Sequence, residues 1–143
     1  MSVKQVSIFL ENKPGSMVEL SDTLAKANVD LRALTLPEAG DYGIARIIVD
    51  DVYKAATALK DSGFVYSLSE VIVLAMEDRP GMLHEAVKLL SENNVNVEHA
   101  YSFLGSHRGV AYMIFKVSDI ATAERVLRKA GMRLADQDEI SEL

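Results

Sequence analysis

Apolar and polar residues follow two kinds of pattern along the chain, and these patterns predict strands and helices in turn. Residues 3–10 are rich in Val, Ile and Phe with partial alternation, which is typical of a strand. From Ser16 onward the apolar residues recur at helical spacing. Pro14 and Gly15 separate the two segments, and Ser16 followed by Glu19 predicts a capping box at the helix start.

The rest of the first half continues in the same way. Further strands are expected at 29–36, 43–49 and 64–68, and a second helix at 52–60. Asn28 tolerates the left-handed conformation and is expected to end the first helix. The segment 37–41, which contains Gly40, is expected to be a loop.

The second half repeats this order. Its expected strands and helices are 71–76, 83–92, 97–104, 110–117, 121–130 and 132–135, followed by a frayed acidic end at 136–143. Each half therefore reads strand, helix, strand, strand, helix, strand, which is the ferredoxin-like βαββαβ unit. We predict an α+β chain of two such modules with antiparallel sheets, packed side by side as a pseudo-dimer, with domains at 1–69 and 70–143.

A short motif marks the repeat. Asn12-Lys13-Pro14-Gly15 recurs as Asp78-Arg79-Pro80-Gly81, a shift of 66 residues. The same shift aligns Glu19 with Glu85, Leu24 with Leu90, and Gly43 with Gly109. Solenoids need about three or more repeats, so a duplicated small domain is the better interpretation. Two copies create a seam where a ligand could bind.

Composition narrows the functional classes. The 143 residues carry 15 Lys and Arg against 21 Asp and Glu, and the basic residues are scattered, so we expect no nucleic acid partner. Cysteine is absent, which excludes disulfides and Cys-ligated metal sites. We find neither a signal peptide's apolar core nor an apolar run of membrane-spanning length, and therefore expect a cytoplasmic protein that does not bind membranes.

The residues that could perform catalysis or bind metal lack partners. His84-Glu85 resembles the start of a zinc-protease motif, but Lys88 stands where the second histidine is needed. His99 and the glutamate before it point to opposite faces of a predicted strand. His107 lies in a predicted loop, either solvated or overhanging a site. Serine-hydrolase and nucleotide-binding glycine motifs are absent, so we expect no enzyme, no metal and no cofactor.

Each Pro-Gly loop has the features of a receptor for a zwitterion. Its glycine lets the backbone approach a ligand closely, and the helix that follows presents free N–H groups that suit a carboxylate. Asn12 or Asp78 adds a side chain able to bind an ammonium or amide group. A plain turn, preserved by duplication, is the alternative interpretation.

Two longer segments carry a family resemblance, Glu-Asn-Lys-Pro-Gly-Ser-Met at 11–17 and Glu-Asp-Arg-Pro-Gly-Met-Leu at 77–83. With the turns at 28–31 and 94–97 and the glycines before the third strands, the sequence resembles a tandem ACT-domain protein over nearly its whole length. The resemblance implies amino-acid binding between modules placed edge to edge. The contacts it implies are Asn12, Gly15, Ser16, Met17, Asp30, Asp78, Gly81, Met82, Leu83 and Asn96.

The polar positions depart from those of serine-sensing members, which have Asn at both. Here Asn12 goes with Asp30, and Asp78 with Asn96, so each site is mixed and the two need not be equivalent. The ligand is left open among serine, histidine and branched-chain amino acids. The resemblance implies a free L-amino-acid sensor and homodimer, with its ligand at the seam, that regulates an enzyme or regulator. The alternative is a ligand-free protein–protein interaction module that regulates a partner enzyme or transcription factor.

Overall fold

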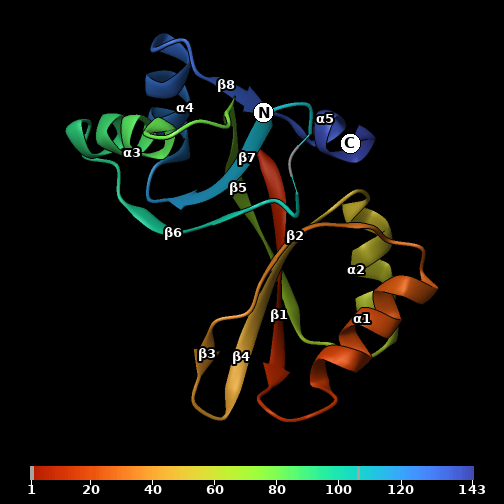
Figure 1. Cartoon of the computed structure of the whole chain (residues 1–143). Coiled ribbons are helices and arrows are strands. Elements are labelled where there is room, and N and C mark those ends of the chain that lie inside the picture. Colours follow the sequence, from red (N-terminus) through yellow and green to blue (C-terminus); the bar gives the residue numbers. More distant parts are fainter. Residues whose placement is uncertain (1, 106) are drawn as a thin grey trace.

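The computed structural model describes residues 2–105 and 107–143, which fold into alternating strands and helices (Figure 1). The strands are β1 (Val3–Glu11), β2 (Leu31–Thr35), β3 (Glu38–Ala39), β4 (Tyr42–Val49), β5 (Tyr66–Glu77), β6 (Val97–Ser102), β7 (Val110–Val117) and β8 (Arg133–Ala135). The helices are α1 (Ser16–Lys26), α2 (Val52–Asp61), α3 (Met82–Glu92), α4 (Ile120–Lys129) and α5 (Gln137–Glu142).

All strands belong to one antiparallel sheet. Six of them follow the order β2-β4-β1-β5-β7-β6, while β3 pairs with β4 and β8 pairs with β5. The first module runs from β1 to the first half of β5, and the second from the rest of β5 to β8. The α+β class and the two ferredoxin-like modules are therefore confirmed.

Strand β5 belongs to both modules, whereas the sequence predicted two separate strands at 64–68 and 71–76. Its first half pairs with β1 and its second half with β7. The polar residues that interrupt the apolar pattern lie opposite polar residues of β1: Ser67 opposite Ser7, Ser69 opposite Gln5, and Glu70 opposite Lys4. The strand therefore continues through them, and the predicted boundary between residues 69 and 70 falls inside β5.

The acidic end of the chain is a helix, not the frayed tail that the sequence predicted. Asp136 caps α5, because its carboxylate accepts a hydrogen bond from the Glu139 backbone N–H at 2.9 Å. Ile140 is fully buried. One cap and one buried side chain thus fix a segment whose composition alone suggested disorder.

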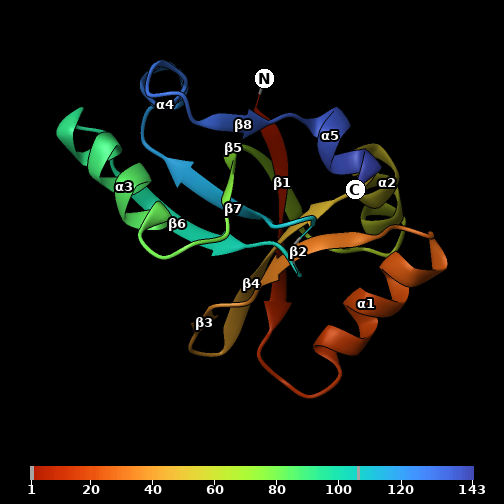
Figure 2. The same cartoon turned by 45° about the horizontal axis from the view of Figure 1, so that its top comes forward.

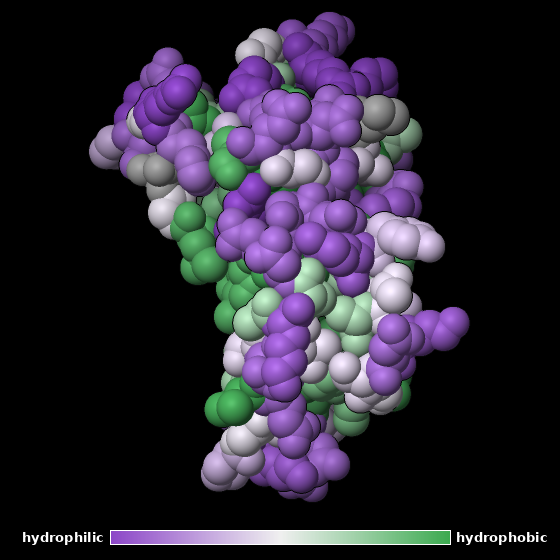
Figure 3. All heavy atoms as spheres, turned by 90° about the vertical axis from the view of Figure 1, so that its right-hand side faces the viewer, coloured by the Kyte–Doolittle hydropathy of each residue, from purple (hydrophilic) through white to green (hydrophobic). Residues whose placement is uncertain are grey.

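Each pair of helices covers one face of its own module. Helices α1 and α2 pack on the first module and α3 and α4 on the second (Figure 1). The outward surface over α1 and α2 is largely hydrophilic (Figure 3). Among the described residues, no helix has both the length and the apolar character needed to cross a membrane.

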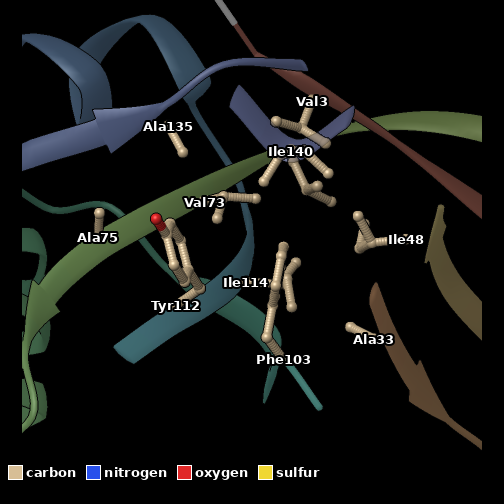
Figure 4. Packing of buried hydrophobic residues seen from close by; sticks show 11 residues of the cluster. Val3, Ala33, Ile48, Val73, Ala75, Phe103, Tyr112, Ile114, Ala135 and Ile140 are labelled. Atoms are coloured by element: carbon tan, nitrogen blue, oxygen red, sulfur yellow. The ribbon is translucent and has the colours of Figure 1, made fainter. Parts of the chain in front are cut away.

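The opposite faces of the two modules enclose a third core, which we call the central cluster. Its buried members are Val3, Ala33, Ile48, Val71, Val73, Ala75, Phe103, Tyr112, Ile114, Ala135 and Ile140 (Figure 4). The sheet curls until β2 meets the end of β6, where Ala33 pairs with Phe103 and the Leu104 N–H donates to the Arg32 carbonyl at 2.8 Å (Figure 2). The strands therefore surround an inner space, with α5 packed over one end.

Candidate functional site at the first Pro-Gly loop

The loop between β1 and α1 turns sharply at Gly15. This residue has a φ of 94° and is the N-cap of α1, a left-handed conformation that glycine adopts without a steric penalty. The predicted capping box is wrong. Ser16 is already the first helical residue, and no side chain bonds to the helix start.

Two backbone amides at this helix start are open. The Ser16 N–H donates into the loop at 3.4 Å and the Glu19 N–H donates to the Gly15 carbonyl at 3.0 Å. Between them, the N–H groups of Met17 and Val18 have no hydrogen-bond partner among the described residues. They lie at the positive end of the α1 dipole and suit an anionic group.

Asn12 fastens the loop to the turn between β3 and β4. Its backbone N–H donates to the Asp41 carbonyl at 2.8 Å, and its side-chain Nδ2 donates to the Gly40 carbonyl at 2.9 Å. The side-chain Oδ1 is left as an acceptor. The loop therefore has a fixed shape with one amide oxygen available to a ligand.

A hollow of about 160 Å³ opens beside this loop. Its walls are Leu10, Glu11, Asn12, Lys13, Ser16, Met17, Leu36, Pro37, Glu38 and Gly43, all from the first module. Pockets for drug-sized ligands measure roughly 300–1,000 Å³, so this one suits a smaller molecule. A Cβ at Gly43 would lie 3.2 Å from both Leu36 Cδ1 and the Pro37 carbonyl oxygen, so only glycine leaves the hollow its present width.

The second loop repeats the backbone geometry. Gly81 has a φ of 90° and is the N-cap of α3, again without a side-chain cap. The Glu85 N–H donates to the Gly81 carbonyl at 3.0 Å, while the N–H groups of Leu83 and His84 have no partner among the described residues. Leu83 is 46% exposed. Met82 is the first residue of α3 and lies beside it.

The second loop differs at its polar residue. The Asp78 backbone N–H donates to the Gly109 carbonyl at 3.1 Å, as the Asn12 N–H does to Asp41. The Asp78 side chain is a carboxylate, which cannot donate a hydrogen bond in place of the Asn12 amide. The two loops therefore offer different chemistry.

Asp30 does not lie beside its own module's loop. It precedes β2, and its N–H donates to Asp50 Oδ1 at 2.9 Å, beyond the last residue of β4. Asn12 bonds to Asp41, before the first residue of β4. The Asp30 carboxylate pairs with the Arg32 guanidinium.

Asn96 is placed in the same way in the second module. Its N–H donates to Ser118 Oγ at 3.0 Å, just beyond the end of β7. Asp78 instead bonds to Gly109, just before the start of β7. Within each module, the structure therefore brings together the loop residues but not the residue at the start of the second strand.

The two Pro-Gly loops lie at opposite ends of the molecule (Figure 1). Strands β1 and β5 are antiparallel, and Val3 pairs with Val71, so Glu11 and Glu77 extend in opposite directions. Strand geometry separates these two ends by roughly 40 Å. The two loops therefore do not lie next to each other.

One polar cluster in the inner space was missed by the sequence analysis. Gln5 is only 1% exposed, and its Oε1 accepts from the Tyr101 hydroxyl at 2.7 Å and lies 3.2 Å from His99 Nε2. Burial raises the pKa of Tyr101 well above its ordinary value. A glutamine on the same strand face as the apolar Val3 was the available signal, but its partners Tyr101 and His99 lie on β6 of the other module.

Comparisons with known proteins agree with this architecture. A family model described as "ACT domain pair" matches residues 1–143. The crystal structure of protein BT0572 from Bacteroides thetaiotaomicron is 36% identical, with a TM-score of 0.93, covering 100% of this chain and 98% of that one. The ligand-free regulatory subunit of aspartate kinase from Thermus thermophilus shares the fold at 14% identity and a TM-score of 0.63, covering 89% and 91%.

No curated protein matches the chain. The family model spans the whole sequence, and the BT0572 structure is similar over its full length. The chain belongs to the ACT domain pair family.

Proposed function

We propose that this protein is a free L-amino-acid sensor without catalytic activity, and that its ligand binds at the first Pro-Gly loop. The observation that carries the proposal is the hollow beside Asn12, which joins open helix amides, carboxylates and apolar side chains in a space below drug size. An amino acid carries the complementary groups: a carboxylate, an ammonium and a side chain.

Each ligand group has a matching part of the wall. The amides of Met17 and Val18 suit the carboxylate, because they are unpaired and lie at a helix N-terminus. Asn12 Oδ1 and the Glu38 carboxylate suit the ammonium. The apolar Leu36 and Met17 side chains would contact the ligand's own side chain.

The second loop is proposed as a separate, non-equivalent site. Asp78, Gly81, Met82 and Leu83 repeat the arrangement around the open amides of α3. Asp30 and Asn96 would reach a loop only when a second copy of the chain brings them there, which is the reason to propose a homodimer. A ligand can change this dimerisation, or binding to a regulated enzyme or regulator, only if it binds the associated and the free forms with different affinity.

A thermal-shift screen against the twenty L-amino acids, followed by calorimetry, tests the proposal. A ligand at about 100 times its Kd adds roughly 2.7 kcal/mol of stability. Gly15→Asp places a carboxylate at the open amides of α1 and should abolish the shift. Gly131→Asp is the matched control, because Gly131 also has a positive φ, of 82°, and an open surrounding. Gly81→Asp makes the same change at the second loop and shows whether binding there is independent of the first loop.

No shift with any amino acid, or equal losses in Gly15→Asp and Gly131→Asp, would contradict the proposal. An interaction module without a ligand is then the alternative, and one observation favours it. Phe9 and Tyr42 are 47% and 40% exposed and stack with ring centroids 4.9 Å apart on the open face of the first module. Self-association that Phe9→Ser removes, unaffected by any amino acid, would support this alternative.

A further inference from the structure

The inner face of the sheet changes from apolar to polar along its strands. The central cluster and α5 occupy one end, and a group of polar residues lies next to the cluster on the same face. We call six of these residues the inner polar layer: Gln5, Ser7, Arg46, Ser69, His99 and Lys116. Strand alternation and the pairs Ser7–Arg46, Gln5–Ser69 and His99–Lys116 place them on one face.

Gln5 anchors this layer across the two modules. Its Nε2 donates to Ser69 Oγ at 3.4 Å, and its Oε1 accepts from Tyr101 on β6 at 2.7 Å. Since an amide oxygen only accepts, His99 must carry a proton on Nε2 to bond to Oε1 at 3.2 Å. His99 Nδ1 is then the ring atom left to face other groups.

The layer carries more positive than negative charge. Arg46 is a partly buried residue, and its guanidinium has neither an ion pair nor a hydrogen bond within the described residues. Lys116 Nζ lies 3.7 Å from Glu98 Oε2, a long contact. Burial lowers the pKa of His99, and the nearby Arg46 and Lys116 lower it further, while Glu98 acts in the opposite direction.

We propose that the inner polar layer binds the oxyanion group of a small ligand, a phosphate or a carboxylate, between the two modules. The planar fork of Arg46 suits two oxyanion oxygens at once, Lys116 adds a point charge, and the Ser7 hydroxyl can donate. The guanidinium of this partly buried residue has no protein partner, and the anion supplies one.

Binding of the anion changes the charge of His99. The pKa of His99 rises because an anion favours the imidazolium form, and its Nδ1–H then becomes a further donor. Arg46 belongs to the first module and His99 and Lys116 to the second, so the bound group links the modules. The site shares no residue with the first Pro-Gly loop, so each proposal can fail without the other.

The test uses the full chain, with inorganic phosphate and succinate added separately at constant ionic strength. The expected result is saturable binding of at least one anion by calorimetry, and the anion that binds identifies the oxyanion class. Histidine ring NMR should show the pKa of His99 rising with that anion.

Charge-matched variants make the result specific. Arg46→Gln should weaken binding about tenfold or more, because it removes charged hydrogen bonds. Arg125→Gln removes the same charge from the exposed face of α4 and should leave binding unchanged. If the Arg46→Gln variant does not fold, the Lys116→Gln variant is measured in its place. The proposal is overturned when neither anion saturates, when His99 does not titrate differently, or when Arg125→Gln weakens binding as much as the layer variants.

Discussion

Asn12 and Asp78 occupy the same place in the two copies, and one amide group distinguishes them. Asn12 Nδ2 donates to the Gly40 carbonyl at 2.9 Å, a bond that a carboxylate cannot make. The duplicated motif therefore preserved the backbone turns at Gly15 and Gly81, with φ values of 94° and 90°, while the side chains diverged. At the scale of single residues, the copies share a loop shape and differ in what the loop offers a ligand.

This difference predicts unequal losses for two matched substitutions. Asn12→Ala removes the side-chain bond to the first loop's neighbouring turn and should lower the free energy of unfolding by about 0.5–1.5 kcal/mol. Asp78→Ala removes no such bond and should cost less. Urea unfolding of both variants measures the difference. Equal losses would mean that the bond to Gly40 contributes nothing to stability.

His99 makes stability depend on pH. Its pKa is lowered by burial first, then by Arg46 and Lys116, so between the folded value and the ordinary value of 6.5 the unfolded chain binds more protons. The contribution of neutral His99 is therefore complete above 6.5 and is lost as the pH falls below it.

The variant His99→Gln tests this contribution, because it keeps an N–H donor for Gln5 but cannot titrate. Its free energy of unfolding should fall less than that of the wild type between neutral and mildly acidic pH. Identical pH slopes for His99→Gln and the wild type would contradict the assignment.

Elements were predictable from the sequence where a local pattern decides them. Helical spacing located α1 to α4, and β-branched residues located β4 and β7. The continuity of β5 was not predictable, because Ser69 and Glu70 look like a break until Gln5 and Lys4 are placed opposite them. Helix α5 depends on one apolar residue, Ile140, whose burial is decided by distant strands.

The candidate site shows the same division. The repeated motif located the Pro-Gly loops and their open amides. The far wall of the hollow, with Leu36 and Gly43, required the register of β3 and β4. Strand direction decides where Asp30 lies, and it lies at the other end of β4 from Asn12. The inner polar layer was missed because its members come from different strands of both modules.

Helix α5 should stabilise the whole chain through Ile140. This side chain is fully buried in the central cluster, and α5 also binds the first module, where the Arg32 Nε donates to the Ile140 carbonyl at 3.0 Å. Ile140→Ala should cost about 2–5 kcal/mol of unfolding free energy and Ile140→Val about 0.5–1.5 kcal/mol. Denaturant unfolding gives both values. Losses below about 0.5 kcal/mol for both would mean that α5 detaches readily.

For the whole molecule, the two modules should form one folding unit. They share β5, they close against each other where Ala33 meets Phe103, and the central cluster draws on both. Two helix-side cores would otherwise favour two independent domains. The shared strand and shared core decide against independence, since neither module can bury its inner face alone.

Two pairs of fragments test this unity. Residues 1–69 with 70–143 divide the chain at the predicted boundary and cut β5, whereas 1–63 with 64–143 leave β5 whole. Cutting β5 separates Val71 and Val73 of the central cluster from the half of the strand that pairs with most of β1. These two fragments should therefore stay unfolded, both separately and when mixed. The second pair keeps every residue of β5 on one fragment and should recover strand and helix signals on mixing, because the complete strand can pair with β1 and β7. Circular dichroism and amide NMR of each fragment and each mixture measure the outcome. A cooperative melt from residues 1–69 alone would establish the first module as an independent domain, with β5 joining two separately stable units.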